Sequence, residues 1–122
     1  MIKVLIADDH EFMRMGVKML LEGTDDIVVA AEATNGEEVL DKLKGDNFDV
    51  MVLDLAMPKK TGIEVLRELK AQGNKIPALI LSAHSMEECG ELAIKEGAVG
   101  FLSKEDAPEK LIDSIRKVSK DK

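Results

Sequence analysis

Apolar and polar positions along this chain fall into two alternating patterns. Five short runs rich in aliphatic and β-branched residues have the length of strands. They cover residues 2–7, 27–33, 48–53, 77–82 and 99–103. From Val50 onward the third run is apolar throughout and leads straight into Asp54, which is typical of a strand buried on both faces. Between and after the runs, apolar residues recur at helical spacing, which predicts a helix after each strand.

Each predicted helix begins at a recognisable start signal. The first opens at His10 and Glu11, and its expected apolar face consists of Phe12, Met13, Val17, Leu20 and Leu21. Capping-box spacings predict the next three starts at Thr34, Thr61 and Ser85. The last helix is capped from Asp106 to Glu109, and its expected apolar face consists of Leu111, Ile112, Ile115 and Val118. The fourth helix is acidic and poor in large apolar residues, so we expect it to be the least firmly held.

Most methionines, including Met13, Met15 and Met19, are expected in the core, although exposed methionines would suit partner contacts.

Five strands that alternate with five helices predict an α/β domain with a parallel sheet, because each helix must act as a right-handed crossover. In such a sheet, ligands bind outside the carboxyl ends of the strands. Polar residues stand at four of the five strand ends, and we expect them to converge at one edge. They are Asp8, Asp9, Asp54, Ser82 and Lys104.

Size and charge restrict the function. A chain of 122 residues fits one domain with a core of its own. The net charge of -7 and the three aromatic residues argue against binding nucleic acid, through its phosphates or by base stacking. The single cysteine, Cys89, excludes an internal disulfide, and no Cys/His spacing typical of a metal site occurs. With no run long enough to span a membrane and no signal-peptide pattern, we expect a cytoplasmic protein.

The residues at the sheet edge suit phosphoryl transfer. Adjacent carboxylates such as Asp8 and Asp9 are costly to ionise unless a cation lies between them, and oxygen ligands suit Mg²⁺. A carboxylate such as Asp54 is a competent nucleophile toward phosphorus, while Lys104 and Ser82 can bind phosphoryl oxygens. The residues alone leave simpler readings open: a solvated strand end with an N-capping aspartate, and a turn in which Asp54 precedes Pro58.

These motifs, with Met57-Pro58 and Gly62 after Asp54, resemble the receiver domain of two-component response regulators over essentially the whole chain. Residues 6–10 and 103–105 look most similar to receivers of the NarL/FixJ type. The resemblance implies a CheY-like, flavodoxin-like fold: a doubly wound sheet in strand order 2-1-3-4-5 with helices on both faces. It also implies that Asp54 accepts a phosphoryl group from a histidine kinase or phosphotransfer protein.

The resemblance assigns further roles. Asp9, Asp54 and the main-chain carbonyl of Ala56 would bind Mg²⁺ directly, and Asp8 mostly through water. Ser82 and Phe101 look like a switch pair that alters the surface offered to an output partner or to a second copy in a homodimer. NarL/FixJ-type regulators usually carry a DNA-binding domain after the receiver, and we expect residues 1–122 to contain the receiver alone.

Two other functions stay open. An unphosphorylated pseudo-receiver would act purely as a binding module, but the residues needed for phosphorylation are all present. A phosphohydrolase with an aspartate nucleophile needs an acid two residues later, where this chain has Ala56. We therefore expect self-limited phosphorylation rather than turnover on outside substrates. His10 and His84 are expected to be surface residues, and Cys89 inert. Lys60 stands in a loop position that is commonly apolar in the family, which puts the loop packing in question.

Overall fold

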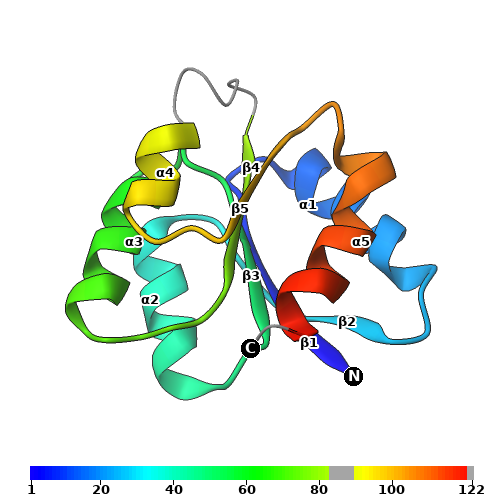
Figure 1. Cartoon of the computed structure of the whole chain (residues 1–122), viewed down its shortest axis with the longest axis horizontal. Coiled ribbons are helices and arrows are strands. Elements are labelled where there is room, and N and C mark those ends of the chain that lie inside the picture. The colour runs from blue at the N-terminus through cyan, green and yellow to red at the C-terminus, as the bar shows by residue number, and fades with distance from the viewer. Residues whose placement is uncertain (83–89, 121–122) are drawn as a thin grey trace.

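The computed structural model describes residues 1–82 and 90–120, with only the backbone described at Lys120. Its five strands form one parallel sheet in the order β2-β1-β3-β4-β5 (Figure 1). The strands are β1 (Ile2–Ala7), β2 (Ile27–Ala33), β3 (Val50–Leu53), β4 (Ala78–Ser82) and β5 (Gly100–Ser103). The predicted α/β class and strand order are confirmed. In this order the chain reverses direction across the sheet between β1 and β3, and the carboxyl ends of strands at such a point are where open α/β sheets bind ligands.

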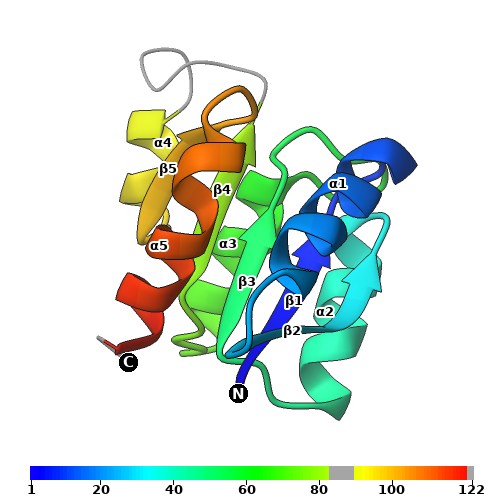
Figure 2. The same ribbon diagram turned by 90° about the vertical axis from the view of Figure 1, so that its right-hand side faces the viewer.

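Helices cover both faces of the sheet. They are α1 (Glu11–Glu22), α2 (Gly36–Gly45), α3 (Gly62–Ala71), α4 (Glu91–Lys95) and α5 (Ala107–Lys120). In Figures 1 and 2, α1 and α5 lie on one face, and α2, α3 and α4 lie on the other. The chain is therefore doubly wound. Within the described ranges, no helix is both long enough and apolar enough to cross a lipid bilayer.

The central strands are buried on both sides because their side chains alternate between two apolar clusters. Leu5, Leu53 and Ile80 pack into the cluster beneath α2, α3 and α4. Ile6 and Val52, their neighbours along the strands, pack into the cluster beneath α1 and α5. This packing explains why β1 and β3 read as continuous apolar runs, and it holds the residues that follow them rigidly in place.

The helix starts agree only in part with the predicted capping boxes. At α3 the box is present, because Glu64 N donates to Thr61 Oγ1 and Thr61 N donates to Glu64 Oε1, both at 3.2 Å. At α2 the predicted cap, Thr34, was wrong by one position. Asn35 is the N-cap, and its Oδ1 accepts a hydrogen bond from Glu38 N at 2.9 Å. The box predicted at Ser85 lies outside the described residues.

The predicted apolar face of α1 was wrong at Phe12, whose side chain is 88% exposed. Val17 and Leu21 are buried, as expected. A helix turns about 100° per residue, so Phe12 lies about 140° around the helix from Val17. The same geometry leaves Met15 and Met19 at 46% and 71% exposure, which contradicts their expected place in the core.

Candidate functional site at the carboxyl edge of the sheet

The predicted site residues follow strands that are neighbours in the sheet. Asp8 comes directly after β1 and Asp54 directly after β3, and Asp54 N donates to Ala7 O at 2.9 Å. Ser82 is the last residue of β4, and its carbonyl accepts a hydrogen bond from Lys104 N, also at 2.9 Å. The backbone of the sheet therefore places all of them at one edge, as the strand pattern predicted.

Two buried carboxylates form the centre of the site. Asp8 is 4% exposed and Asp54 is 3% exposed, so neither is the solvated strand end of the simpler reading. The ammonium of Lys104 lies 3.1 Å from Asp8 Oδ2 and 3.8 Å from Asp54 Oδ2. One ammonium thus faces two buried acids, which leaves the centre short of positive charge.

Asp54 is the less satisfied of the two acids. Its Oδ2 is buried and accepts no hydrogen bond within the described part of the chain. Burial raises the pKa of the Asp54 carboxyl, and the nearby charge of Asp8 raises it further. Lys104 and a hydrogen bond from the backbone of Ala56 oppose this shift in pKa, and Asp9 adds to it. A buried oxygen without a partner is costly, and here it marks where an electrophile or a cation can bind.

His10 joins the acidic residues, a contact that the sequence analysis did not anticipate. Its side chain is 60% exposed, yet Nδ1 lies 2.9 Å from Asp8 Oδ1 and 3.2 Å from Asp9 Oδ1. Its backbone N also donates to Asp8 Oδ1 at 2.9 Å. No spacing rule predicts this arrangement, because it depends on the conformation of the turn between β1 and α1.

Arg14 is a second residue that the sequence analysis missed. Its Nη1 donates to the main-chain oxygen of Asp8 at 2.8 Å, and its Nε donates to Glu32 Oε1 at 3.1 Å. Glu32 also pairs with Lys18 at 3.0 Å. The side chain of Arg14 is only 15% exposed, so this network fixes the turn that carries Asp8 and Asp9. The one sequence feature that hints at this contact with Asp8 is the position of Arg14, one helical turn after the start of α1.

The donor set fits a divalent cation. Carboxylate oxygens of Asp8, Asp9 and Asp54 and a ring nitrogen of His10 all lie within 4.8 Å of one another. Oxygen-rich sets of this kind suit Mg²⁺, and Asp54 Oδ2, which has no hydrogen-bond partner among the described residues, supplies a ligand atom. The main-chain N–H of Ala56 faces Asp54, while a role for the Ala56 carbonyl as a ligand stays a prediction.

The loop after Asp54 is closed tightly against the site. Gly62 N donates to Leu55 O at 2.9 Å, and a Cβ on Gly62 would lie 2.6 Å from Asp54 O. Lys59 takes a left-handed conformation with φ of 65°, which is unfavourable for a side chain with a Cβ. Lys60, which stands at a position that is commonly apolar in the family, is partly exposed, and its ammonium pairs with Glu68 at 2.8 Å.

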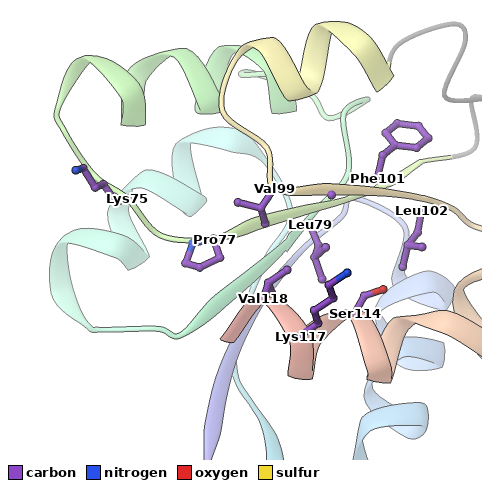
Figure 3. Close-up of a pocket in the computed structure, with 10 residues that line it drawn as sticks. Lys75, Pro77, Leu79, Val99, Phe101, Leu102, Ser114, Lys117 and Val118 are labelled. Atoms are coloured by element: carbon purple, nitrogen blue, oxygen red, sulfur yellow. The ribbon is translucent and has the colours of Figure 1, made fainter. Parts of the chain in front are cut away.

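The predicted switch pair occupies two environments. Ser82 is 1% exposed at the end of β4. Phe101 is partly buried and packs against the apolar cluster beneath α2, α3 and α4. In Figure 3 its ring and the side chain of Leu102 lie on opposite sides of β5. This position is compatible with ordinary packing and with a switch, so the role of Phe101 stays a prediction.

A separate cavity of about 540 Å³ lies between β5 and the C-terminal half of α5 (Figure 3). Leu79, Val99 and Val118 give it an apolar lining, with Lys75 and Lys117 also on its wall. It contains none of the acidic residues of the site. Phe101, the aromatic residue of the predicted switch pair, also lines this cavity.

Comparison with known proteins identifies the family. The sequence model of the response regulator receiver domain family matches residues 4–116. The chain belongs to this family. The receiver is 33% identical over 118 residues to the response regulator UvrY of Escherichia coli K12, covering 97% of this chain and 54% of UvrY. It is 34% identical over 116 residues to the nitrate/nitrite response regulator protein NarL of the same strain, covering 95% of this chain and 54% of NarL. Both relatives are NarL/FixJ-type regulators, which confirms the predicted subtype.

The fold agrees with that of solved receivers. The receiver domain of the Francisella response regulator 1452 aligns with a TM-score of 0.88 and 33% identity, covering 98% of each chain. The present chain spans about half the length of the curated relatives it matches. The similarity to these full-length regulators is thus a similarity to their receiver portion.

Proposed function

We propose that this receiver accepts a phosphoryl group on Asp54, with Mg²⁺, from a sensor histidine kinase or a phosphotransfer protein in the cytoplasm. The observation that carries the proposal is the buried Asp54 Oδ2, which has no hydrogen-bond partner in residues 1–82 and 90–120 and lies 3.8 Å from Lys104 Nζ. An oxygen in this position lies at the carboxyl edge of the sheet with the ammonium of Lys104 beside it. That is the arrangement that in-line phosphoryl transfer needs, since the reaction depends mainly on alignment and charge neutralisation.

In the proposed step, an Asp54 carboxylate oxygen forms a bond to phosphorus while the bond from phosphorus to the donor's imidazole nitrogen breaks. A proton taken from solvent on the donor's other ring nitrogen lets the imidazole leave as a neutral group. Lys104 pairs with a phosphoryl oxygen, and the hydroxyl of Ser82 donates to another. Mg²⁺ would neutralise charge on the phosphoryl oxygens, held by Asp9, Asp54 and the Ala56 carbonyl, with Asp8 acting through water.

The position of Lys104 favours this function over a passive binding module. Its ammonium already spans Asp8 and Asp54 at 3.1 and 3.8 Å, so a phosphoryl group on Asp54 would compete with Asp8 for it. Such competition couples phosphorylation to the start of α5, because Lys104 lies three residues before that helix. We infer that the resulting shift in population alters the surface offered to an output partner or to a second copy.

A hydrolase acting on outside substrates is the weaker alternative. The residue two positions after Asp54 is Ala56, which is exposed and carries no acid to protonate a leaving group. We therefore propose that the chemistry is confined to the domain's own phosphorylation and dephosphorylation.

The test is the intact mass of the protein after incubation with acetyl phosphate and Mg²⁺. We expect one added phosphoryl group on the wild type and none on Asp54→Asn. Asp41→Asn is the matched control, because Asp41 is an exposed aspartate on α2 and should not affect labelling. Equal labelling of Asp54→Asn would refute the proposal, and steady release of phosphate from outside esters would favour the hydrolase.

A further inference from the structure

The imidazole of His10 occupies an unusual place, between the two carboxylates that follow β1. Its Nδ1 lies 2.9 Å from Asp8 Oδ1 and 3.2 Å from Asp9 Oδ1. The His10 backbone cannot easily move away. Its N–H donates to Asp8 Oδ1 at 2.9 Å, and its carbonyl accepts from Arg14 N at 3.1 Å as the first turn of α1 begins. The ring nitrogen is therefore held at the acidic residues although the side chain is largely exposed.

These separations match those of ligands on one cation. Ligand bonds of about 2.1 Å in an octahedral shell place neighbouring ligand atoms about 3.0 Å apart. The separation of 3.2 Å between His10 Nδ1 and Asp9 Oδ1 is close to that length, and the donor atoms of Asp8, Asp9, His10 and Asp54 all lie within 4.8 Å of one another. Ligand atoms on opposite sides of the same shell would stand about 4.2 Å apart. The most widely separated donor atoms therefore need to approach each other by at most about 0.6 Å.

A second observation points to a ligand at the same place. Asp54, which is 3% exposed, has a buried Oδ2 with no hydrogen-bond partner in the described part of the chain. Within the part of the chain that the structure describes, the ammonium beside it is that of Lys104, which also pairs with Asp8. Within the described residues, the cluster holds three acids against the ammonium of Lys104 and the imidazole of His10, so it favours binding of a cation.

The imidazole changes which cation the cluster prefers. Mg²⁺ favours oxygen ligands and keeps several waters, so it gains little from a ring nitrogen. Later first-row divalent ions bind imidazole well, and their affinity for a mixed nitrogen and oxygen set rises toward Ni²⁺ and Cu²⁺. If His10 is a ligand in addition to Asp9, Asp54 and the Ala56 carbonyl, and only these ions use it, then it must shift the selectivity of the site away from Mg²⁺.

We propose that His10 is an inner-sphere ligand for late first-row divalent cations at this site and leaves Mg²⁺ binding almost unchanged. The inference rests on the proposed function, because it takes the phosphorylation site to be a divalent-cation site. The site would then bind a second class of cation, for which Ni²⁺ is the probe, and His10 is the residue that makes this binding favourable. Such an ion would occupy the Mg²⁺ position with a ligand that Mg²⁺ does not use.

The test is a calorimetric titration of the metal-free protein with Ni²⁺ and, separately, with Mg²⁺. The background variant carries His84→Ala and Cys89→Ser, so that His10 is the only imidazole and no thiol can bind the ion. In that background we expect His10→Ala to lower the Ni²⁺ affinity by about tenfold or more, and the Mg²⁺ affinity by less than about threefold. His10→Asn keeps a hydrogen-bonding group without an imidazole and should behave like the alanine variant.

A spectroscopic signature separates a ligand from a residue that merely orients the acids. Pulsed electron paramagnetic resonance of bound Cu²⁺ should show coupling to an imidazole nitrogen in the background protein and none after His10→Ala. Equal losses of Mg²⁺ and Ni²⁺ affinity would mean that His10 only positions Asp8 and Asp9, and would overturn the inference. An unchanged Ni²⁺ affinity would overturn it as well.

Failure of this inference is distinguishable from failure of the proposed function. Phosphorylation of Asp54 with Mg²⁺, measured by intact mass on the same variants, would persist if only the role of His10 were wrong. If no variant were phosphorylated and yet Ni²⁺ affinity depended on His10, the proposed function alone would fail.

Discussion

Replacing the Asp54 carboxylate by an amide should stabilise the metal-free protein. Asp54 is 3% exposed, its Oδ2 has no hydrogen-bond partner among the described residues, and the neighbouring charge of Asp8 opposes its ionisation. Asp54→Asn keeps the shape of the side chain and removes its charge. The Asp54 carboxylate, which the proposed phosphorylation requires, is therefore predicted to lower the free energy of unfolding when no cation is bound.

The magnitude follows from three contributions. At an effective dielectric constant of about 20, attraction to Lys104 at 3.8 Å amounts to about 4 kcal/mol. Repulsion from Asp8, whose oxygen lies within 4.8 Å, has nearly the same size, so the two charges largely cancel. The burial of an oxygen without a partner then remains, and it costs about 1 to 3 kcal/mol. We therefore expect Asp54→Asn to raise the free energy of unfolding by about 2 kcal/mol.

Urea denaturation in the presence of a chelator measures this gain. The chain has no tryptophan or tyrosine, so far-ultraviolet circular dichroism is the suitable probe. For a protein of this size, a gain of about 2 kcal/mol moves the midpoint by roughly 1 M urea. Added Mg²⁺ should narrow the difference, because it binds the folded wild type more tightly than the variant. If Asp54→Asn is no more stable than the wild type in the chelator, this reasoning is refuted.

The gain should also depend on pH, with a definite sign. Because the pKa of Asp54 is raised in the folded state, the folded protein holds the proton more firmly than the unfolded chain does. The wild type therefore loses stability as the pH rises from the ordinary carboxyl value of 3.8 through the raised pKa of Asp54. The gain in the free energy of unfolding from Asp54→Asn should be largest at a pH above the raised pKa of Asp54 and should vanish below pH 3.8. A gain that persists at the acid end would contradict the assignment to the Asp54 charge.

Two backbone positions near the site give further predictions. Lys59→Gly should raise the free energy of unfolding by about 1 kcal/mol, because it relieves a left-handed lysine with φ of 65°, whereas Lys60→Gly should lower it. Urea denaturation of both variants checks this, and equal effects would contradict it. Gly62→Ala should cost about 1 to 3 kcal/mol and reduce phosphorylation, because its Cβ would lie 2.6 Å from Asp54 O. The matched control is Gly16→Ala on α1, where the added Cβ meets nothing within 4 Å, and it should raise the free energy of unfolding by up to about 1 kcal/mol. If Gly16→Ala lowered the free energy of unfolding as much as Gly62→Ala does, the steric argument would be refuted.

The sequence predicted the strands and the site because both depend on short-range patterns. The run before Asp54 is apolar at every position of β3, so its burial on both faces and the place of Asp54 at its end follow from the pattern. The chain order of strands and helices then brings Asp8 and Lys104 to the same edge, because parallel strands share a direction.

What the sequence did not predict depends on the rotational phase of a helix or on loop conformation. Phe12 is one residue from Met13, yet a step of about 100° takes it from the apolar face to solvent. The cap at Asn35 rather than Thr34 was missed because either side chain can accept a hydrogen bond from a helix N-terminus. The contact of His10 with Asp8 and the bond of Arg14 to the Asp8 carbonyl arise from one turn, whose shape no periodicity encodes.

The central claim is that Asp54, and no other carboxylate, receives the phosphoryl group. Borohydride reduces an acyl phosphate to the alcohol, so a phosphorylated aspartate becomes homoserine, which peptide mass spectrometry can locate. After treatment with acetyl phosphate and Mg²⁺, we predict homoserine at position 54, at neither Asp8 nor Asp9, and none without Mg²⁺. Homoserine at either of those two residues, or at no residue despite an added phosphoryl group, would contradict the account.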